Sequence, residues 1–361
     1  MTRSTKSGAS RIIPRTPRVS RIPRPGGAVT AGLAAAALAL LATACGPGPG
    51  PAASRAAVPS GAEPVPQDVH TLPNSKLPPG TLGTSCVPHG SLRPAGPLPS
   101  PGHMPAGSTM AAIAQRGYLR VGVDQTIDLS SYRNPLTGRL EGFDISVAQQ
   151  IAQAIFGKPA NGNPDEHIQF KAITSAQRIP VIQHGQVDIV ADSMTITCTR
   201  QKSVDFSSDY FDAHQELLVP KNSPVTGQGD LHGKKVCADA GTTSIQQIQA
   251  MPSHPIPVAA DNWTDCLVML EQNQIAAIST DDSVLAGLAA QDPYTRLLGP
   301  TFTYEQHGIA ISKNAPDLVR FVNAVLERMR TDGKWTELYQ LWFVPGLRKT
   351  VPAPPAPSYA G

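Results

Sequence analysis

The segment from Leu119 onward alternates strand-like and helix-like runs, and this alternation limits the folds open to the chain. Leu119–Val123 is a short apolar strand-like run, and the next stretch carries apolar residues at helical spacing, from Ile145 to Ile155. Strand-like runs recur at Ile168–Ile173 and Val187–Val190, with a helical stretch between them at Ala176–His184. Strands and helices in alternation predict a mostly parallel α/β sheet.

A second set of elements follows Pro220. We expect strands at 234–238 and 275–278 and helices at 241–251, 263–270, 318–329 and 335–343. The strongest helix is the third of these, because its apolar positions recur with the spacing i, i+3, i+4, i+7, i+8 and i+11. The sequence therefore predicts α/β structure on both sides of Pro220.

Proline and glycine are concentrated outside these elements. The chain of 361 residues contains 36 Pro and 31 Gly, and much of the excess lies between Gly46 and Gly107. Such a segment cannot bury enough apolar surface to offset its ordering entropy. We expect residues 45–106 to form a tether and the Pro-rich residues 347–361 to form a mobile tail.

The amino terminus has the features of an export signal. Seven basic residues and no acidic residue precede an apolar, Ala-rich run at Ala28–Ala44, which is too short to span a bilayer. The small residues before Cys45 are similar to a bacterial lipobox, although Ala42 stands where that pattern prefers Leu. We expect residues 1–44 to be a lipoprotein signal peptide and Cys45 to carry the lipid. A secretory signal cut elsewhere is the alternative.

Loss of this segment changes the net charge. The formal charge of the whole chain is +3, and removal of the seven basic residues brings it to −4. A nucleic-acid-binding function therefore has no support from the charge.

Four cysteines remain after Cys45, an even number that suits an oxidising compartment. We favour a disulfide between Cys237 and Cys266, which lie close in the sequence, and this leaves Cys86 with Cys198. Free buried thiols are the alternative. The four cysteines have no C-x-x-C spacing and the nine histidines are scattered, so we expect neither a metal site nor a cofactor.

Several short motifs in a fixed order resemble those of bacterial extracellular solute-binding proteins, family 3, which deliver polar amino acids to ABC importers. The similarity extends over about 117–344 and is closest to the actinobacterial glutamine-binding lipoproteins. The motifs are Gly142-Phe143-Asp144, Arg178-Ile179-Pro180, Gly185-Gln186-Val187-Asp188, Met194-Thr195-Ile196-Thr197-Cys198, Arg200, Val204-Asp205-Phe206-Ser207, Tyr210-Phe211, Gly241-Thr242-Thr243, Trp263-Thr264-Asp265-Cys266 and Thr280-Asp281-Asp282.

The resemblance implies the two-lobed α/β fold of type II periplasmic binding proteins, with two hinge strands and a ligand cleft between the lobes. On this basis residues 107–215 and 306–346 form lobe 1, and residues 216–305 form lobe 2. We expect a monomer on the extracytoplasmic face of the cell membrane.

A zwitterionic amino acid needs a cation for its α-carboxylate and an anion for its ammonium group. Arg200 can hold a carboxylate through two parallel hydrogen bonds and matches the family's carboxylate-binding arginine. Ser193 and Thr195 lie on the same loop, and Thr243 lies at a helix start with free N–H groups. Asp281, at the end of a strand, suits the ammonium group, with Asp282 as the alternative. The alternative for both aspartates is that they are surface residues with no role in ligand binding.

Residues at the other end of the cleft should set specificity. The segment from Ser175 to Pro180 resembles that of glutamate- and aspartate-binding members, in which the arginine, here Arg178, holds the side-chain carboxylate. An arginine that ties its loop to a nearby carboxylate is the alternative. Asp124, after the first strand, keeps glutamine and asparagine among the candidate ligands, and Tyr132 is a candidate stacking aromatic.

We therefore expect a lipid-anchored binding protein for glutamate or aspartate, and then for glutamine or asparagine. It would serve an ABC-transporter permease or a membrane sensor protein. The sequence has no G-x-S-x-G, P-loop or H-E-x-x-H motif. The enzymatic alternative on the same fold is a periplasmic dehydratase acting on prephenate or arogenate.

Overall fold

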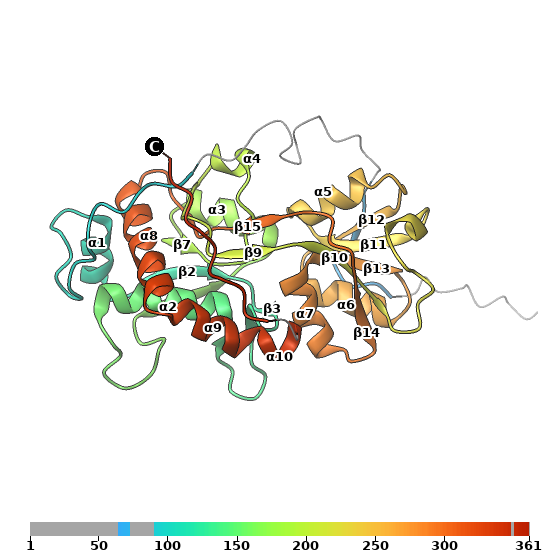
Figure 1. Ribbon diagram of the computed structural model, residues 1–361, viewed down its shortest axis with the longest axis horizontal. Coiled ribbons are helices and arrows are strands. Elements are labelled where there is room, and N and C mark those ends of the chain that lie inside the picture. The colour runs from blue at the N-terminus through green and yellow to red at the C-terminus, as the bar shows by residue number, and fades with distance from the viewer. Residues whose placement is uncertain (1–63, 73–89, 348–349, 361) are drawn as a thin grey trace, which may run out of the picture. The chain divides into compact units, whose positions relative to one another are not determined.

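The computed structural model describes residues 64–72, 90–347 and 350–360 (Figure 1). The expected signal peptide, Cys45 and Cys86 lie outside the described residues. None of the helices in the described ranges combines the length and the apolarity of a membrane-spanning helix.

Two main sheets, each with its own hydrophobic core, organise residues 64–360. We call the five-stranded sheet with its helices the first lobe, and the six-stranded sheet with its helices the second lobe. The strand orders are β6-β2-β7-β16-β8 in the first lobe and β1-β12-β11-β13-β10-β14 in the second. Neighbouring strands β6, β2 and β7 are parallel, and so are β12, β11 and β13. The predicted α/β class is confirmed, with antiparallel strands added at the edges of both sheets.

The strands of the first lobe are β2 (Leu119–Val123), β6 (Ile168–Ala172), β7 (Ile189–Val190), β8 (Asp205–Phe206) and β16 (Ala310–Ile311), with a smaller sheet of β3 (Thr126–Ile127), β4 (Ser131–Arg133) and β5 (Leu140–Glu141). The strands of the second lobe are β1 (His70–Thr71), β10 (Gln215–Pro220), β11 (Lys235–Asp239), β12 (Ile256–Ala260), β13 (Ala277–Asp281) and β14 (Thr295–Leu298). The chain passes between the lobes at β9 (Phe211–Ala213) and again at β15 (Glu305–His307), and these two strands pair antiparallel with each other (Figure 1). They take the positions of the two expected hinge strands.

The helices are α1 (Thr109–Arg116), α2 (Phe143–Phe156), α3 (Arg178–Gln183), α4 (Cys198–Gln201), α5 (Thr243–Ala250), α6 (Trp263–Glu271), α7 (Asp282–Gln291), α8 (Pro316–Thr331), α9 (Lys334–Trp342) and α10 (Val344–Leu347), with 3-10 turns η1 (Ser175–Gln177) and η2 (Gln228–Leu231). Local signals set several of these bounds. The Thr242 side chain caps α5 by accepting a hydrogen bond from the Ile245 N–H. Pro316 begins α8, where its missing N–H costs nothing.

A disulfide links β11 to α6 in the second lobe. Cys237 and Cys266 are fully buried, and their Cα atoms are 5.7 Å apart. Cys198 also takes part in a disulfide, and the partner expected for it, Cys86, lies outside the described residues.

The Pro-rich segments differ from the expectation of a mobile tether and tail where they are described. His70–Thr71 extends the second sheet by pairing antiparallel with β12. Ser91 forms a parallel β-bridge with Tyr359, so the start and the end of the body meet. Leu92, Leu98, Met104 and Val351 pack against the core of the first lobe. Scattered apolar residues are enough for these segments to pack, because α8 offers them a preformed surface.

Candidate functional site

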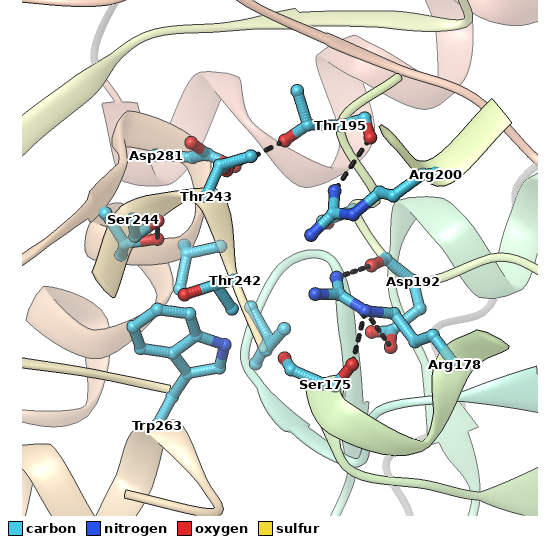
Figure 2. A pocket seen from close by; sticks show the side chains of 14 residues that line it. Ser175, Arg178, Asp192, Thr195, Arg200, Thr242, Thr243, Ser244, Trp263 and Asp281 are labelled. Atoms are coloured by element: carbon cyan, nitrogen blue, oxygen red, sulfur yellow. Dashed lines mark hydrogen bonds and ion pairs between the residues drawn. The ribbon is translucent and has the colours of Figure 1, made fainter. Parts of the chain in front are cut away.

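A small pocket with a cavity volume of about 10 Å³ lies between the two lobes. Figure 2 shows Ser175, Arg178, Asp192, Thr195 and Arg200 on one side of it and residues of the second lobe on the other. The side chains that line it are Ile127, Ser175, Arg178, Asp192, Ser193, Thr195, Arg200, Thr242, Thr243, Ser244, Trp263, Thr280, Asp281 and Val284. Most of them follow the carboxyl ends of strands, the edge at which open α/β sheets bind ligands.

Arg200 is held between the lobes by two backbone carbonyls. Its Nη1 donates to the Thr195 oxygen at 2.7 Å, and its Nη2 donates to the Gly241 oxygen at 3.1 Å. The side chain of Thr197 caps the short helix α4, which carries Arg200. Burial, and then the positive charge of Arg178, lowers the pKa of Arg200 to about 9. A ligand carboxylate beside this guanidinium would stabilise its charged form.

Thr243 and Ser193 lie where the sequence predicted them, in the lining of the pocket. Thr243 is the first residue of α5, and its hydroxyl is 3.3 Å from that of Thr195, across the two lobes. The Asp144 carboxylate positions Ser193 by accepting hydrogen bonds from its N–H and its hydroxyl, at 2.8 and 3.0 Å. Ser193 has a φ of +40°, and these bonds stabilise that uncommon backbone conformation.

Asp281, rather than Asp282, faces the pocket. Its Oδ2 is 2.9 Å from Nε2 of His307, while its Oδ1 has no hydrogen-bond partner among the described residues. Burial opposes the charge on His307, but the hydrogen bond and the charge of Asp281 outweigh it and raise the pKa of His307. Asp282 instead accepts hydrogen bonds from the backbone N–H groups of His214 and Ser283.

Arg178 lines the opposite end of the pocket from Asp281. Its Nε donates to the backbone carbonyl oxygen of Ser175 at 2.9 Å, and its Nη1 donates to the backbone carbonyl oxygen of Asp192 at 3.1 Å. The Asp192 carboxylate is 4.0 Å from Nε, so the ion pair with a nearby carboxylate is present as well. Nη2 has no hydrogen-bond partner in the described part of the chain. Arg178 therefore ties its loop to a nearby carboxylate, and one of its donors is left unpaired among the described residues.

Two of the residues expected in the cleft are absent from the pocket lining. Asp124 does not line the pocket, because its Oδ1 accepts hydrogen bonds from the backbone and the hydroxyl of Thr126. Tyr132 lies on β4, with its hydroxyl 3.4 Å from Glu141, and does not line the pocket either. The aromatic residue of the lining is Trp263, the first residue of α6 after β12.

Sequence reasoning also missed Asp192 and His307 as members of the site. Asp192 lies two residues after the end of β7, so its place close to a strand end was a usable signal. His307 lies on β15, and only the pairing of the hinge strands brings it to Asp281. The described residues contain no cluster of three or more potential metal ligands.

The chain is similar to known proteins of one bacterial family. The family model of the bacterial extracellular solute-binding proteins, family 3, matches residues 119–345. The glutamine-binding protein GlnH of an ABC transporter from Bacillus subtilis is 38% identical over 235 residues, which are 65% of this chain and 84% of that protein. The glutamate-binding protein GluB of Corynebacterium efficiens is 30% identical over 244 residues, 65% of this chain and 81% of the relative.

Among solved structures, an ancestral amino acid-binding protein described as a precursor of cyclohexadienyl dehydratase has a TM-score of 0.58 and 32% sequence identity. The match covers 65% of this chain and all of that one.

Proposed function

This chain belongs to the bacterial extracellular solute-binding proteins, family 3, and we propose that its pocket binds an L-amino acid with an acidic or amide side chain. The candidates are glutamate and aspartate, and then glutamine and asparagine. The observation that carries the proposal is the placing of Arg200 and Asp281 on one small pocket, with an oxygen of Asp281 left for a ligand. A cation and an anion in the lining of the same pocket suit the two charges of an α-amino acid.

The rest of the pocket supports the same ligand class. Arg178 offers its Nη2 to the side-chain end of the ligand. The relatives named as glutamine- and glutamate-binding proteins carry ligands of this class. Both ends of such a ligand would meet charged or polar partners in a site closed to water.

The family places the protein outside the cytoplasm. We infer in addition that the lipid on Cys45 anchors it to the membrane. There it either delivers its ligand to an ABC-transporter permease or reports the ligand to a membrane sensor protein. Closure of the two lobes over the ligand would be the state that either partner recognises.

Thermal unfolding of the protein against the twenty amino acids, one at a time, tests the ligand class. A ligand that binds only the folded state at 100 times its Kd adds about 2.7 kcal/mol. For a body of this size that raises Tm by several degrees. We expect shifts with Glu, Asp, Gln and Asn, and none with Lys or Arg. The absence of a shift with all twenty would contradict the proposal.

We further propose a binding protein and not an enzyme. Prephenate and arogenate should therefore remain unconverted when they are incubated with the purified protein and followed by chromatography. Turnover of either compound would move the assignment to the dehydratase alternative.

A further inference from the structure

Three buried carboxyl groups lie near Arg178 at the end of the pocket that would meet a ligand side chain, and of these Asp192 contacts it, at 4.0 Å from Nε. Asp124 follows β2, Asp192 follows β7 and Asp239 ends β11, so they arrive from three connections and from both lobes. Their exposed fractions are 1%, 1% and 0%. Asp239 is tied to the first lobe by the Ser175 hydroxyl at 3.3 Å. One guanidinium thus shares a buried region with three carboxyl groups.

The unpartnered atoms of this cluster indicate what a ligand would have to supply. Among the described residues, Nη2 of Arg178 has no acceptor, and neither Oδ2 of Asp192 nor Oδ1 of Asp239 has a donor. Oδ2 of Asp124 has none either, and of the three carboxyl groups only that of Asp192 belongs to the pocket lining. The cluster therefore lacks one acceptor and several donors.

A carboxamide and a carboxylate meet this requirement differently. A carboxamide has an oxygen that can accept from Arg178 and two N–H donors for the aspartate oxygens. A carboxylate has only acceptors, and it would bring a fourth negative charge to one guanidinium in a buried site. Protonation of one carboxyl group restores a donor and removes that charge.

We propose, on the basis of the function proposed above, that Asp192 selects the ligand side chain: amide ligands bind as they are, and acidic ligands bind only together with a proton. The proton comes from solution and resides within the ligand–aspartate cluster. Asp192 is the member that both lines the pocket and contacts Arg178, at 4.0 Å from Nε. Burial raises the pKa of Asp124, Asp192 and Asp239, so each of them is prepared to accept a proton.

Other charged groups act on this cluster without distinguishing the two ligand types. The charge of Arg178 lowers the pKa of Asp192, and the charge of Asp144 on α2 raises it. The charge of Asp192 in turn raises the pKa of Arg200. Ser175 and Thr126 donate hydrogen bonds to Asp239 and Asp124. The Asp281–His307 pair lies at the α-amino end of the pocket and would affect glutamate and glutamine alike. A comparison of these two ligands therefore cancels the titration of His307.

Calorimetric titration of the whole protein with glutamate and with glutamine, between pH 5.5 and pH 8.5, tests the proposal. Uptake of one proton makes the Kd for glutamate rise by up to about tenfold per pH unit, whereas the Kd for glutamine stays nearly constant. Titrations in two buffers of different ionisation enthalpy should give about one proton taken up per glutamate and none per glutamine. Parallel pH profiles for the two ligands would overturn the proposal.

The variant Asp192→Asn removes one of the three charges with little change in shape. At pH 7.5 we expect the affinity for glutamate relative to glutamine to increase about tenfold or more, with a smaller pH slope. The matched control is Asp205→Asn, at a residue that pairs with Lys313 on the surface of the same lobe and should leave the ratio unchanged.

An unchanged ratio in Asp192→Asn would refute the role of Asp192. The wild-type pH profiles decide the question if that variant fails to fold. If glutamate, aspartate, glutamine and asparagine all fail to bind the wild type at every pH, the proposed function fails and this inference fails with it. If all four bind with equal pH dependence, only this inference fails.

Discussion

Asp281 and Asp282 are adjacent in the sequence, yet the fold directs their carboxylates to different surroundings. Asp281 ends β13, faces the pocket and contacts His307. Asp282 begins α7 and accepts hydrogen bonds from backbone N–H groups. The two residues therefore form a natural pair of test and control.

We expect Asp281→Asn to weaken binding of every ligand by about 30-fold or more, because loss of one partner of a buried charge pair costs about 2–5 kcal/mol. Asp282→Asn keeps a side-chain oxygen that can accept from the backbone N–H groups of His214 and Ser283, and it should leave the affinity within about threefold of wild type. Calorimetric titration of both variants measures the difference. Equal losses in the two variants would mean that the ammonium partner has been wrongly assigned.

The residue types of the site were more predictable than their partners. Arg200 and Thr243 could be predicted because the motifs that contain them end strands or begin helices. Asp124 could not be excluded, because its position after β2 also suited the pocket, and only its local hydrogen bonds to Thr126 turn it away. The three carboxylates around Arg178 come from distant parts of the chain, and no local pattern records that meeting.

At the scale of elements, α8 holds more than its apolar face indicates. Its apolar positions predict the helix. They do not predict that the polar side chain of Asn323, also on α8, is completely buried, with an exposed fraction of 0%. Asn323 donates to the Ser91 hydroxyl at 2.7 Å and to the Leu92 oxygen at 2.6 Å, and it accepts from the Ser208 N–H at 2.7 Å. Periodicity could not show this contact, because the covering segment is Pro-rich and distant in sequence.

We expect Asn323→Ala to lower the free energy of unfolding by about 2 kcal/mol or more, because it leaves several buried polar groups without partners. Denaturant unfolding measures the loss, and limited proteolysis should cut residues 90–106 faster than in wild type. The exposed Asn314→Ala serves as the control and should change stability by less than about 0.5 kcal/mol. Wild-type stability in Asn323→Ala would show that the segment is held by other contacts.

At the scale of the whole molecule, the two lobes meet backbone against backbone within the described residues. A Cβ added to Gly287 on α7 would overlap the carbonyl oxygen of Asp128, and one added to Gly241 would lie 2.9 Å from Cα of Ala176. The Thr195–Thr243 and Arg200–Gly241 contacts join the same two surfaces. These glycines leave no room for a side chain at either point.

Gly287→Ala should separate folding from closure. The substitution favours an isolated helix by about 1 kcal/mol, so the ligand-free protein should unfold no more easily than wild type. Binding of every ligand should nevertheless weaken by tenfold or more, and small-angle scattering should show less contraction on addition of ligand. Gly229→Ala, in the 3-10 turn η2 of the same lobe with open space around it, is the control. Unchanged affinity in Gly287→Ala would mean that the closed contact yields without cost.

The α/β class followed from the alternation of strands and helices, and the two lobes followed from the family motifs. The strand β1 did not follow from either, because its pairing depends on an open edge of β12, and an edge that will accept a strand has no local signature in the sequence. The Pro-rich segments at both ends of the body were misjudged for the same physical reason, since their order comes from surfaces supplied elsewhere in the chain.

The bridge between Ser91 and Tyr359 has a consequence for any molecule attached to the carboxyl terminus. The Ser91 N–H donates to the Ser358 oxygen and the Ala360 N–H donates to the Ser91 oxygen, both at 2.9 Å, and the neighbouring Asn323 fixes Ser91 to the first lobe. Both segments that form this bridge are therefore attached to the first lobe. A fluorescent protein fused after Gly361 would report the orientation of the first lobe and would not report changes in the distance between the two lobes.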